Sequence, residues 1–294
     1  MKQAVTVGIL FPGEMGASIG RLLHSRGIRV VSTLEGRSKR TAQLCYAAGL
    51  TVLDSVGEVV SHSDVIISTV PPGAAISVAQ RVAAEFRPGR RPAVYVDANS
   101  ISPVTMRHLG SVILRPNFTL VDAAIHGVAA RLSHDATMYL SGSSASEVAA
   151  MVGTPPRLVL LGDEVGRASL FKMLLGGTSK GTVALMIELS DLASSNGILD
   201  EFWTESRRWY PGIMDLYQRL LPTYPQHVGR RIQEMGELEL TLSNARREPI
   251  MAAAVRNLFS RAAGSPATLL ALVERMSRQP ADNTGPPTAF DDST

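Results

Sequence analysis

Residues 5–20 read VTVGILFPGEMGASIG, and this stretch decides the fold class. An apolar, β-branched run at 5–11 leads through a proline and a glycine into a helical pattern that begins near Ala17. Such a turn lets the backbone approach a pyrophosphate, and the helix that follows supplies free N–H groups and the positive end of its dipole. The pattern predicts a dinucleotide site formed by Pro12, Gly13, Glu14, Met15 and Gly16.

The alternation of short apolar runs and amphipathic stretches continues well beyond this turn. Apolar strands without a polar face, separated by helices, are typical of a parallel sheet that is covered on both sides. Crossovers between such strands are almost always right-handed, which gives a doubly wound α/β sheet of the Rossmann type. We predict this sheet within residues 1–163, with strands at 5–11, 29–34, 65–70, 93–96, 112–114, 118–123, 137–141 and 157–161.

After about residue 165 the strand pattern ends. Residues 166–194 form one long helical pattern. Further helical segments follow, and prolines lie at their edges, where a missing N–H donor does least harm. The sequence therefore predicts an all-helical second domain at 164–278, and a disordered tail at 279–294. Its later helices are expected at 199–208, 212–221, 226–246, 251–262 and 266–278.

Composition excludes several classes of protein. The 294 residues, 45% hydrophobic and 19% charged, are enough for two packed units and argue against disorder. No apolar run approaches the roughly 18 residues of a membrane span, and no signal peptide is visible. A single cysteine, Cys45, excludes an intramolecular disulfide and favours a reducing cytoplasm. With a net charge of +3 and no basic stripe, we expect no nucleic-acid partner; the histidine spacing predicts no metal site.

The segment EGRSKR at residues 35–40 follows the second strand and bears on the choice of cofactor. An acidic residue there binds the ribose 2′-OH of NAD, which leaves NAD open through Glu35. Arg37 and Ser38, followed by Lys39 and Arg40, instead favour the 2′-phosphate of NADP through charge-assisted hydrogen bonds. We predict NADP rather than NAD, with Arg37 and Ser38 as the residues that select it.

The chain has only four lysines, and Lys172 lies inside the apolar stretch LFKMLL at 170–175. Apolar surroundings lower the pKa of a lysine, so that it can deliver or remove a proton near neutral pH. Hydride transfer between a C–OH group and a nicotinamide needs such a group. Lys180 lies about 80° further round an ideal helix and can line the same cleft. The alternative for Lys172 is a surface lysine without a chemical role.

Several segments, in order, resemble the β-hydroxyacid dehydrogenase superfamily, which includes 6-phosphogluconate and 3-hydroxyisobutyrate dehydrogenases. Residues 8–16 resemble its G-x-I-G-x-G-x-M-G opening, 68–73 (STVPPG) its loop beside the cofactor, and 97–103 (DANSISP) its turn near the nicotinamide ribose. Residues 122–127 (DAAIHG) stand in place of its substrate loop, and 166–172 (GRASLFK) resemble its catalytic segment. The later residues 172–181 are similar to a subgroup with a short, phosphogluconate-dehydrogenase-like helical domain. The resemblance covers roughly residues 4–262.

The resemblance implies specific roles. The general acid/base is Lys172; residues near the substrate are His126, Gly127, Asn99 and Lys180; further cofactor contacts are Val70, Pro71, Asn99 and Ser100. It also implies a homodimer through the helical domain and a site in the cleft between domains. Phe11, His126 and Gly176 stand where the family carries glycine, serine and asparagine, which leaves the substrate open. We interpret Asp122 as a turn former.

The favoured hypothesis is therefore an NADP-preferring oxidoreductase that acts on a C–OH or C=O group of a small, polar, hydroxyacid-like substrate. One alternative keeps the fold but reduces C=N bonds, as imine reductases do. The other is a non-catalytic NADP-binding sensor. Activity towards cyclic imines that survives loss of Lys172 would favour the first alternative, and tight cofactor binding without turnover would favour the second.

Overall fold

The computed structural model describes residues 5–87, 93–116 and 118–278. The chain divides into two compact units, with the boundary between Leu174 and Leu175, inside helix α7 (Arg167–Ser195). The boundary expected from the sequence, at 163/164, lies just before that helix. The tail expected at 279–294 lies outside the described residues.

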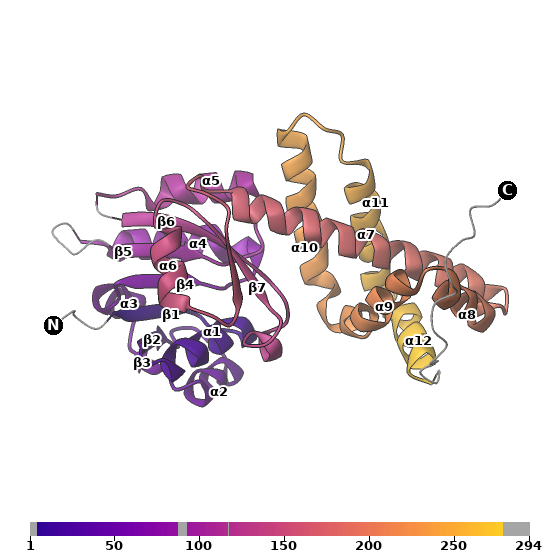
Figure 1. The fold of residues 1–294 in the computed structure, drawn as a ribbon, viewed down its shortest axis with the longest axis horizontal. Helices are drawn as coiled ribbons and strands as arrows, with labels where there is room; N and C mark the ends of the chain where they lie inside the picture. Colours follow the sequence, from indigo (N-terminus) through magenta and orange to yellow (C-terminus); the bar gives the residue numbers. More distant parts are fainter. Residues whose placement is uncertain (1–4, 88–92, 117, 279–294) are drawn as a thin grey trace, which may run out of the picture. The chain divides into compact units, whose positions relative to one another are not determined.

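The first unit is built around one sheet, whose strand order among the described residues is β3-β2-β1-β4-β5-β6-β7-β8 (Figure 1). Neighbouring strands from β3 to β6 are parallel, β7 is antiparallel to β6, and β8 is parallel to β7. The order reverses between β1 and β4, which is where open α/β sheets bind ligands at the carboxyl ends of their strands. The strands are β1 (Thr6–Leu10), β2 (Arg29–Thr33), β3 (Thr51–Leu53), β4 (Val65–Ser68), β5 (Ala93–Asp97), β6 (Phe118–His126), β7 (Thr137–Ser141) and β8 (Arg157–Leu160).

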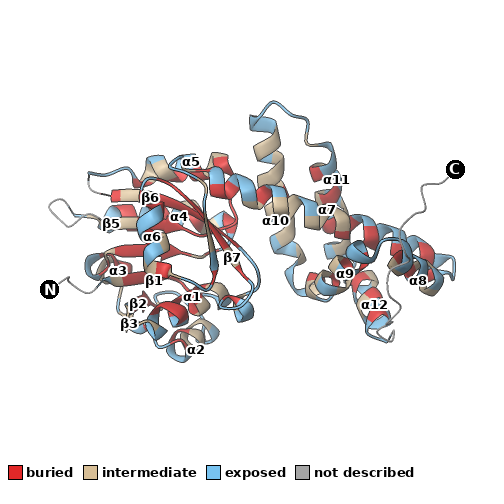
Figure 2. Ribbon diagram, in the orientation of Figure 1, coloured by how far each residue is buried: buried red, intermediate tan, exposed pale blue. Residues whose placement is uncertain are grey.

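Helices cover both faces of this sheet. Apolar side chains of α1 (Glu14–Ser25), α2 (Lys39–Ala47) and α6 (Ala145–Val152) pack into one buried cluster with the strands. Those of α3 (Val56–His62), α4 (Ala75–Glu85) and α5 (Pro103–Ile113) pack into a second cluster. The strands between them are largely buried (Figure 2). The predicted doubly wound sheet is thus confirmed.

Two elements differ from the sequence-based expectation. Residues 112–114, expected as a strand, are the last turn and cap of α5, which Pro103 and the N-cap Ser102 begin. Met106, Leu109 and Ile113 form the buried face of this helix, so the apolar end that suggested a strand belongs to a helical stripe. The edge strand β3 was not expected, because three residues give too short a pattern to recognise.

The second unit is helical throughout its described residues. It contains the later part of α7, followed by α8 (Leu199–Trp209), α9 (Pro211–Leu220), α10 (Tyr224–Asn244), α11 (Ile250–Gly264) and α12 (Pro266–Ser277). Trp203, Tyr217 and Phe259 are fully buried in its core, and Trp203 Nε1 donates to Ser190 Oγ at 2.9 Å. The predicted helical region is confirmed. None of the helices in the described residues combines the length and apolar character that a membrane crossing requires.

Candidate active site at the carboxyl edge of the sheet

The turn after β1 leaves the start of α1 open. Gly13 is the N-cap of α1, with φ −78°, and no side chain caps the helix there. A Cβ atom added to Gly13 would meet nothing within 4 Å. The start of α1, at the positive end of the helix dipole, is therefore open at Gly13 and carries no side-chain cap, an arrangement that suits an anion.

Gly16, one turn further, is tightly enclosed. An added Cβ would collide with Thr69 Oγ1 and would lie 2.9 Å from Pro12 Cβ. Only glycine therefore allows α1 to pack this closely against the loop after β4. Thr69 Oγ1 is buried and has no hydrogen-bond partner among the described residues. An unsatisfied hydroxyl beside an open helix N-terminus fits a bound phosphate group.

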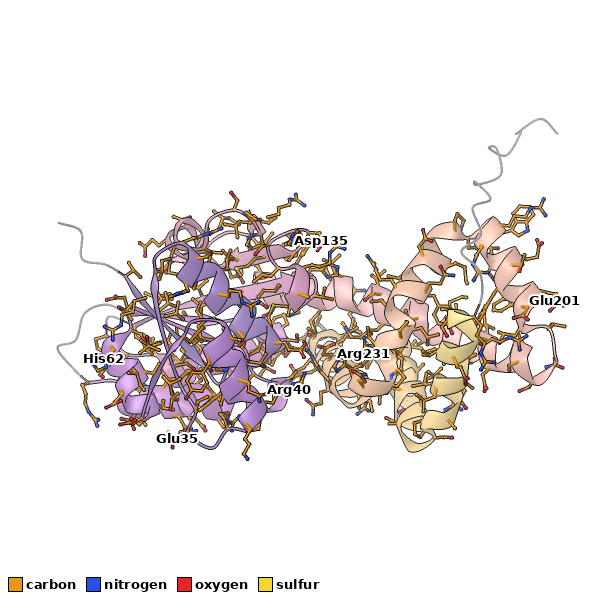
Figure 3. The ribbon with its side chains drawn as sticks, turned by 90° about the horizontal axis from the view of Figure 1, so that it is seen from below. Glu35, Arg40, His62, Asp135, Glu201 and Arg231 are labelled. Atoms are coloured by element: carbon orange, nitrogen blue, oxygen red, sulfur yellow. The ribbon has the colours of Figure 1, made fainter. Side chains whose placement is uncertain are left out.

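Cationic and hydroxyl groups gather after β2. Ser38 caps α2, and its Oγ accepts a hydrogen bond from Thr41 N at 3.3 Å. Arg37 is exposed, and its Nε donates to Gly36 O at 3.1 Å. Arg40 pairs with Glu14, which joins the starts of α2 and α1. Glu35 and Arg40 are labelled in Figure 3. The turn after β1 and this basic segment are thus connected by an ion pair.

Asn99, predicted to contact the cofactor and substrate, ties together the ends of β4 and β5. Its Oδ1 accepts from Val70 N at 2.6 Å, and its Nδ2 donates to Asp97 Oδ2 at 2.7 Å and to Ser68 Oγ at 3.2 Å. Its own N–H donates to Asp97 Oδ1 at 3.0 Å. The side chain therefore fixes the loop of Val70, another predicted cofactor residue.

A polar row that the sequence analysis missed crosses the carboxyl edge of the sheet. Its members are neighbours in register on β4, β5, β6 and β7, and each is fully buried: Ser68, Asp97, Asp122 and Ser141. The available signal was one polar residue near the end of each apolar strand. Strand register, which a single sequence does not reveal, aligns them.

Asp122 connects this row to helix α7. Its Oδ2 accepts from the N–H groups of Gly166 and Ser169, both at 2.9 Å, and its Oδ1 accepts from Ser169 Oγ at 2.7 Å. Asp122 therefore lies in β6 and caps α7 from the sheet, which corrects its interpretation as a turn former. Lys172 follows Ser169 by about one turn and is half-buried, so Asp122 fixes the helical turn that carries it.

The row is acidic and electrostatically coupled to Lys172. Burial raises the pKa of Asp97 to about 7; hydrogen bonds from Asn99 and the charge of Lys172 act in the opposite direction, while Asp122 raises it further. Burial also raises the pKa of Asp122, against its hydrogen bonds. The charge of Lys172 therefore acts on Asp97, although it is the smallest of the influences on the pKa of this buried carboxyl group.

The remaining residues predicted to bind substrate lie in two different units of the chain. His126 is exposed at the end of β6, on the same face of the sheet as Asp122. Gly127 has φ +138°, and a Cβ atom added to it would collide with Ala136. Lys180 belongs to the helical unit, where its Nζ lies 3.0 Å from Glu234 Oε2. The two side chains are only 16% and 12% exposed, so this lysine is held in a largely buried ion pair.

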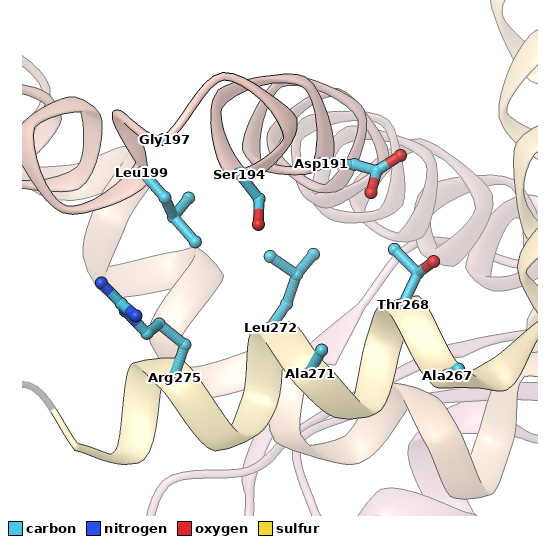
Figure 4. Close-up of a pocket in the computed structure, with 9 residues that line it drawn as sticks. All are labelled: Asp191, Ser194, Gly197, Leu199, Ala267, Thr268, Ala271, Leu272 and Arg275. Carbon is cyan, nitrogen blue, oxygen red and sulfur yellow. The ribbon is translucent and has the colours of Figure 1, made fainter.

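A cavity of about 520 Å³ also lies in the helical unit, between the end of α7, the start of α8 and α12 (Figure 4). Its polar lining includes Asp191, Ser194 and Thr268, together with Arg275, which pairs with Asp200. None of the sequence-predicted site residues lines it. Within the described ranges, no group of three or more His, Cys, Asp or Glu side chains is arranged to hold a metal ion.

Comparison with known proteins agrees with the fold and with an NAD-binding domain in the first unit. Residues 6–152 match the NAD binding domain of 6-phosphogluconate dehydrogenase, and residues 193–262 match a domain of unknown function, DUF1932. A conserved protein of unknown function, whose structure reveals similarity with 3-hydroxyacid dehydrogenases, is 30% identical, with a TM-score of 0.68 over 90% of this chain and 99% of that one.

Two further proteins extend this comparison. An uncharacterized 28.5 kDa protein in the 7S RNA 5′ region of Methanothermus fervidus is 26% identical over 258 residues, which are 86% of this chain and 97% of that protein. The 3-hydroxyisobutyrate dehydrogenase of Mycobacterium tuberculosis is 17% identical, with a TM-score of 0.73 over 92% and 99% of the two chains. At that identity, the likeness concerns the fold alone.

The open turn at Gly13, the switch point between β1 and β4 and the matched domain define an NAD(P)-dependent oxidoreductase. Within that class, the chain belongs to the β-hydroxyacid dehydrogenase superfamily.

Proposed function

We propose that the protein is an NADP-preferring oxidoreductase that interconverts C–OH and C=O groups in a small, polar, hydroxyacid-like substrate, with Lys172 as general acid/base. The observation that carries this proposal is the position of Lys172. It lies on a helical turn that Asp122 anchors to the sheet, within electrostatic reach of Asp97. A proton-transferring group must be held rigidly near the reacting atoms, and this anchored turn does so for Lys172.

When bound, the nicotinamide supplies or accepts a hydride. The residues that would hold the cofactor are the turn at 12–16, Arg37 and Ser38 at the 2′-phosphate, and Val70, Pro71, Asn99 and Ser100. In the direction of oxidation, Lys172 Nζ takes the hydroxyl proton; in reduction it returns that proton and stabilises the negative charge that develops on oxygen. Asn99 acts in addition as a positioning residue for Val70.

His126 and Gly127 are proposed to bind the polar end of the substrate. His126 shares a sheet face with Asp122 and is exposed at the strand end, so its ring can donate a hydrogen bond to a carboxylate. Lys180 is proposed as a further substrate-binding residue; its ion pair with Glu234 competes with that role. Exchange of Glu234 for a substrate carboxylate would keep the ammonium paired.

The catalytic role is tested by steady-state kinetics with NADPH on a panel of small 2- and 3-oxoacids and cyclic imines. We expect Lys172→Ala to lower kcat for the carbonyl substrates by roughly 10²–10⁴-fold, the range of general acid–base catalysis. The Kd for NADPH should not change. Retained carbonyl reduction would overturn the assignment of Lys172. Imine reduction that survives the substitution would point to C=N chemistry, and cofactor binding without any turnover to a sensor module.

The preference for NADP is tested by fluorescence titration with NADPH and NADH at fixed ionic strength, because salt screens phosphate recognition. Arg37→Ala should bring the affinity for NADPH down towards that for NADH. Arg107→Ala, an exposed arginine on α5, serves as the matched control and should change neither affinity. Equal affinities in the wild type would refute the preference for NADP.

We also propose a homodimer formed through the helical unit. Leu185, Leu189 and Leu192 lie on one stripe of α7 and are 55%, 38% and 63% exposed. A stripe of exposed leucines at helical spacing is typical of an association surface. Light scattering should give the mass of a dimer, and Leu189→Glu should shift it to that of the monomer; an unchanged mass would place the interface elsewhere.

A further inference from the structure

Phe11 occupies an unusual backbone position at the end of β1. Its φ is +51°, in the left-handed region that favours glycine. Its side chain is only 6% exposed and belongs to the apolar cluster beneath α3 and α4. A phenylalanine in this conformation is strained, so the contacts of its ring must hold it there.

Two guanidinium groups contact this ring. The Cζ of Arg37 lies 4.6 Å from the ring centroid and the Cζ of Arg81 lies 5.1 Å from it. Arginines within about 6 Å of a ring centroid are attracted to the aromatic face. The ring therefore holds Arg37, from the loop after β2, and Arg81, from α4, around one point at the carboxyl end of β1.

Arg81 also holds the acidic residue of the β2 loop. Arg81 Nη2 lies 2.9 Å from Glu35 Oε1, while Glu35 Oε2 accepts from Val56 N, at the start of α3, at 3.5 Å. Glu35, Val56 and Arg81 together line a cavity of about 290 Å³. Both oxygens of Glu35 are therefore engaged on the side of α3 and α4. Released, this carboxylate is the group that would accept hydrogen bonds from a ribose 2′-OH and repel a 2′-phosphate.

We propose that Arg81 is a specificity-determining positioning residue, which keeps Glu35 bound on the side of α3 and thereby makes the β2 loop selective for a phosphorylated ribose. The inference rests on the proposed preference for NADP. Phe11 contributes the surface on which Arg81 and Arg37 are held at this point. Arg81 acts through Glu35 rather than by contact with the phosphate, and this distinction can be measured.

The ion pair itself contributes little to stability, because its side chains are 43% and 48% exposed. Solvent screens the attraction between charges this exposed. A purely structural role would therefore move neither the stability nor the cofactor preference by much. An effect on the ratio of NADPH to NADH affinity is the readout that separates a positioning role from a structural one.

The test is fluorescence titration of the full-length protein with NADPH and with NADH, on Arg81→Met, Glu35→Gln and the double variant. Methionine keeps the apolar stem of Arg81 and removes its charge. We expect Arg81→Met to lower the NADPH-to-NADH affinity ratio about tenfold, since a freed carboxylate would lie near the phosphate. Adding Glu35→Gln should restore the ratio to within about twofold of the wild type. Arg87→Met, an exposed arginine just beyond α4, is the matched control and should leave the ratio unchanged.

Phe11→Leu keeps an apolar side chain and removes the aromatic face, so it should lower the ratio by a smaller factor, about two- to fivefold. An unchanged ratio in Arg81→Met would overturn the inference while leaving the preference for NADP intact. A ratio that falls but is not restored by Glu35→Gln would mean that Arg81 contacts the phosphate directly, and would also overturn it. Equal affinities in the wild type would refute the proposed function and this inference together.

Discussion

Two regions along the same edge of the sheet carry opposite charges in different surroundings. The first lies at the ends of β1 and β2, and the second lies on β5 and β6. Exposed guanidinium groups, Arg37 and Arg81 among them, gather at the first region around a buried ring. In the second, the carboxyl groups of Asp97 and Asp122 are fully buried and saturated with hydrogen bonds. Exposed charges can contact a ligand or orient a neighbouring charge that does, whereas buried carboxylates mainly hold other groups in place. We expect substitutions in the first region to change binding and those in the second to change stability.

The largest effect is expected at Asp122. Asp122→Ala leaves the buried N–H groups of Gly166 and Ser169 without their acceptor. We expect a loss of about 3–5 kcal/mol in the free energy of unfolding, measured by urea denaturation. Asp135→Ala removes an exposed, surface-paired carboxylate and is the control, with an expected change within about 0.5 kcal/mol. A small effect at Asp122 would mean that the start of α7 does not depend on the sheet.

Asp97 should make the free energy of unfolding depend on pH. Its pKa is about 7 in the folded protein, above the usual 3.8, so between these values the folded state holds a proton that the unfolded state has lost. This contribution to stability is therefore fully present below about pH 4 and is lost as the pH rises to about 7. Asp97→Asn should remove a slope of at most about 1.4 kcal/mol per pH unit from the wild-type curve. Parallel curves from pH 4 to 8 would contradict this assignment.

The smallest effect on stability is expected at Gly13, in the proposed phosphate-binding turn. Gly13→Ala should leave the midpoint of thermal unfolding unchanged, since φ is −78° and an added Cβ meets nothing within 4 Å. It should nevertheless weaken NADPH binding roughly tenfold, or about 1.4 kcal/mol, because the methyl group would crowd the pyrophosphate. Gly16→Ala is the matched comparison; its Cβ would collide with Thr69, so stability should fall by about 1–3 kcal/mol. Unchanged NADPH affinity in Gly13→Ala would place the pyrophosphate elsewhere.

Most of the fold could be predicted from local patterns in the sequence. The alternation of apolar runs and helical stretches predicted the order of the elements. A strand buried on both faces is a continuous apolar run, whereas a helix buried on one face has apolar residues three or four positions apart. The same reasoning failed at 112–114, where three apolar residues at the end of α5 fit both patterns. The turn at 12–16 was recognisable because glycine spacing between a strand and a helix is itself local.

The sequence by itself determined the fold class, the open glycine turn after β1 and the candidacy of Lys172, since each depends on residues that are near neighbours in the chain. Only the tertiary structure decided that Asp122 caps α7 from 44 residues away and that Arg81 holds Glu35. It also placed Lys180 in an ion pair with Glu234. These contacts depend on strand register and helix packing, which bring distant residues to hydrogen-bonding distance and which no local spacing of residue types encodes.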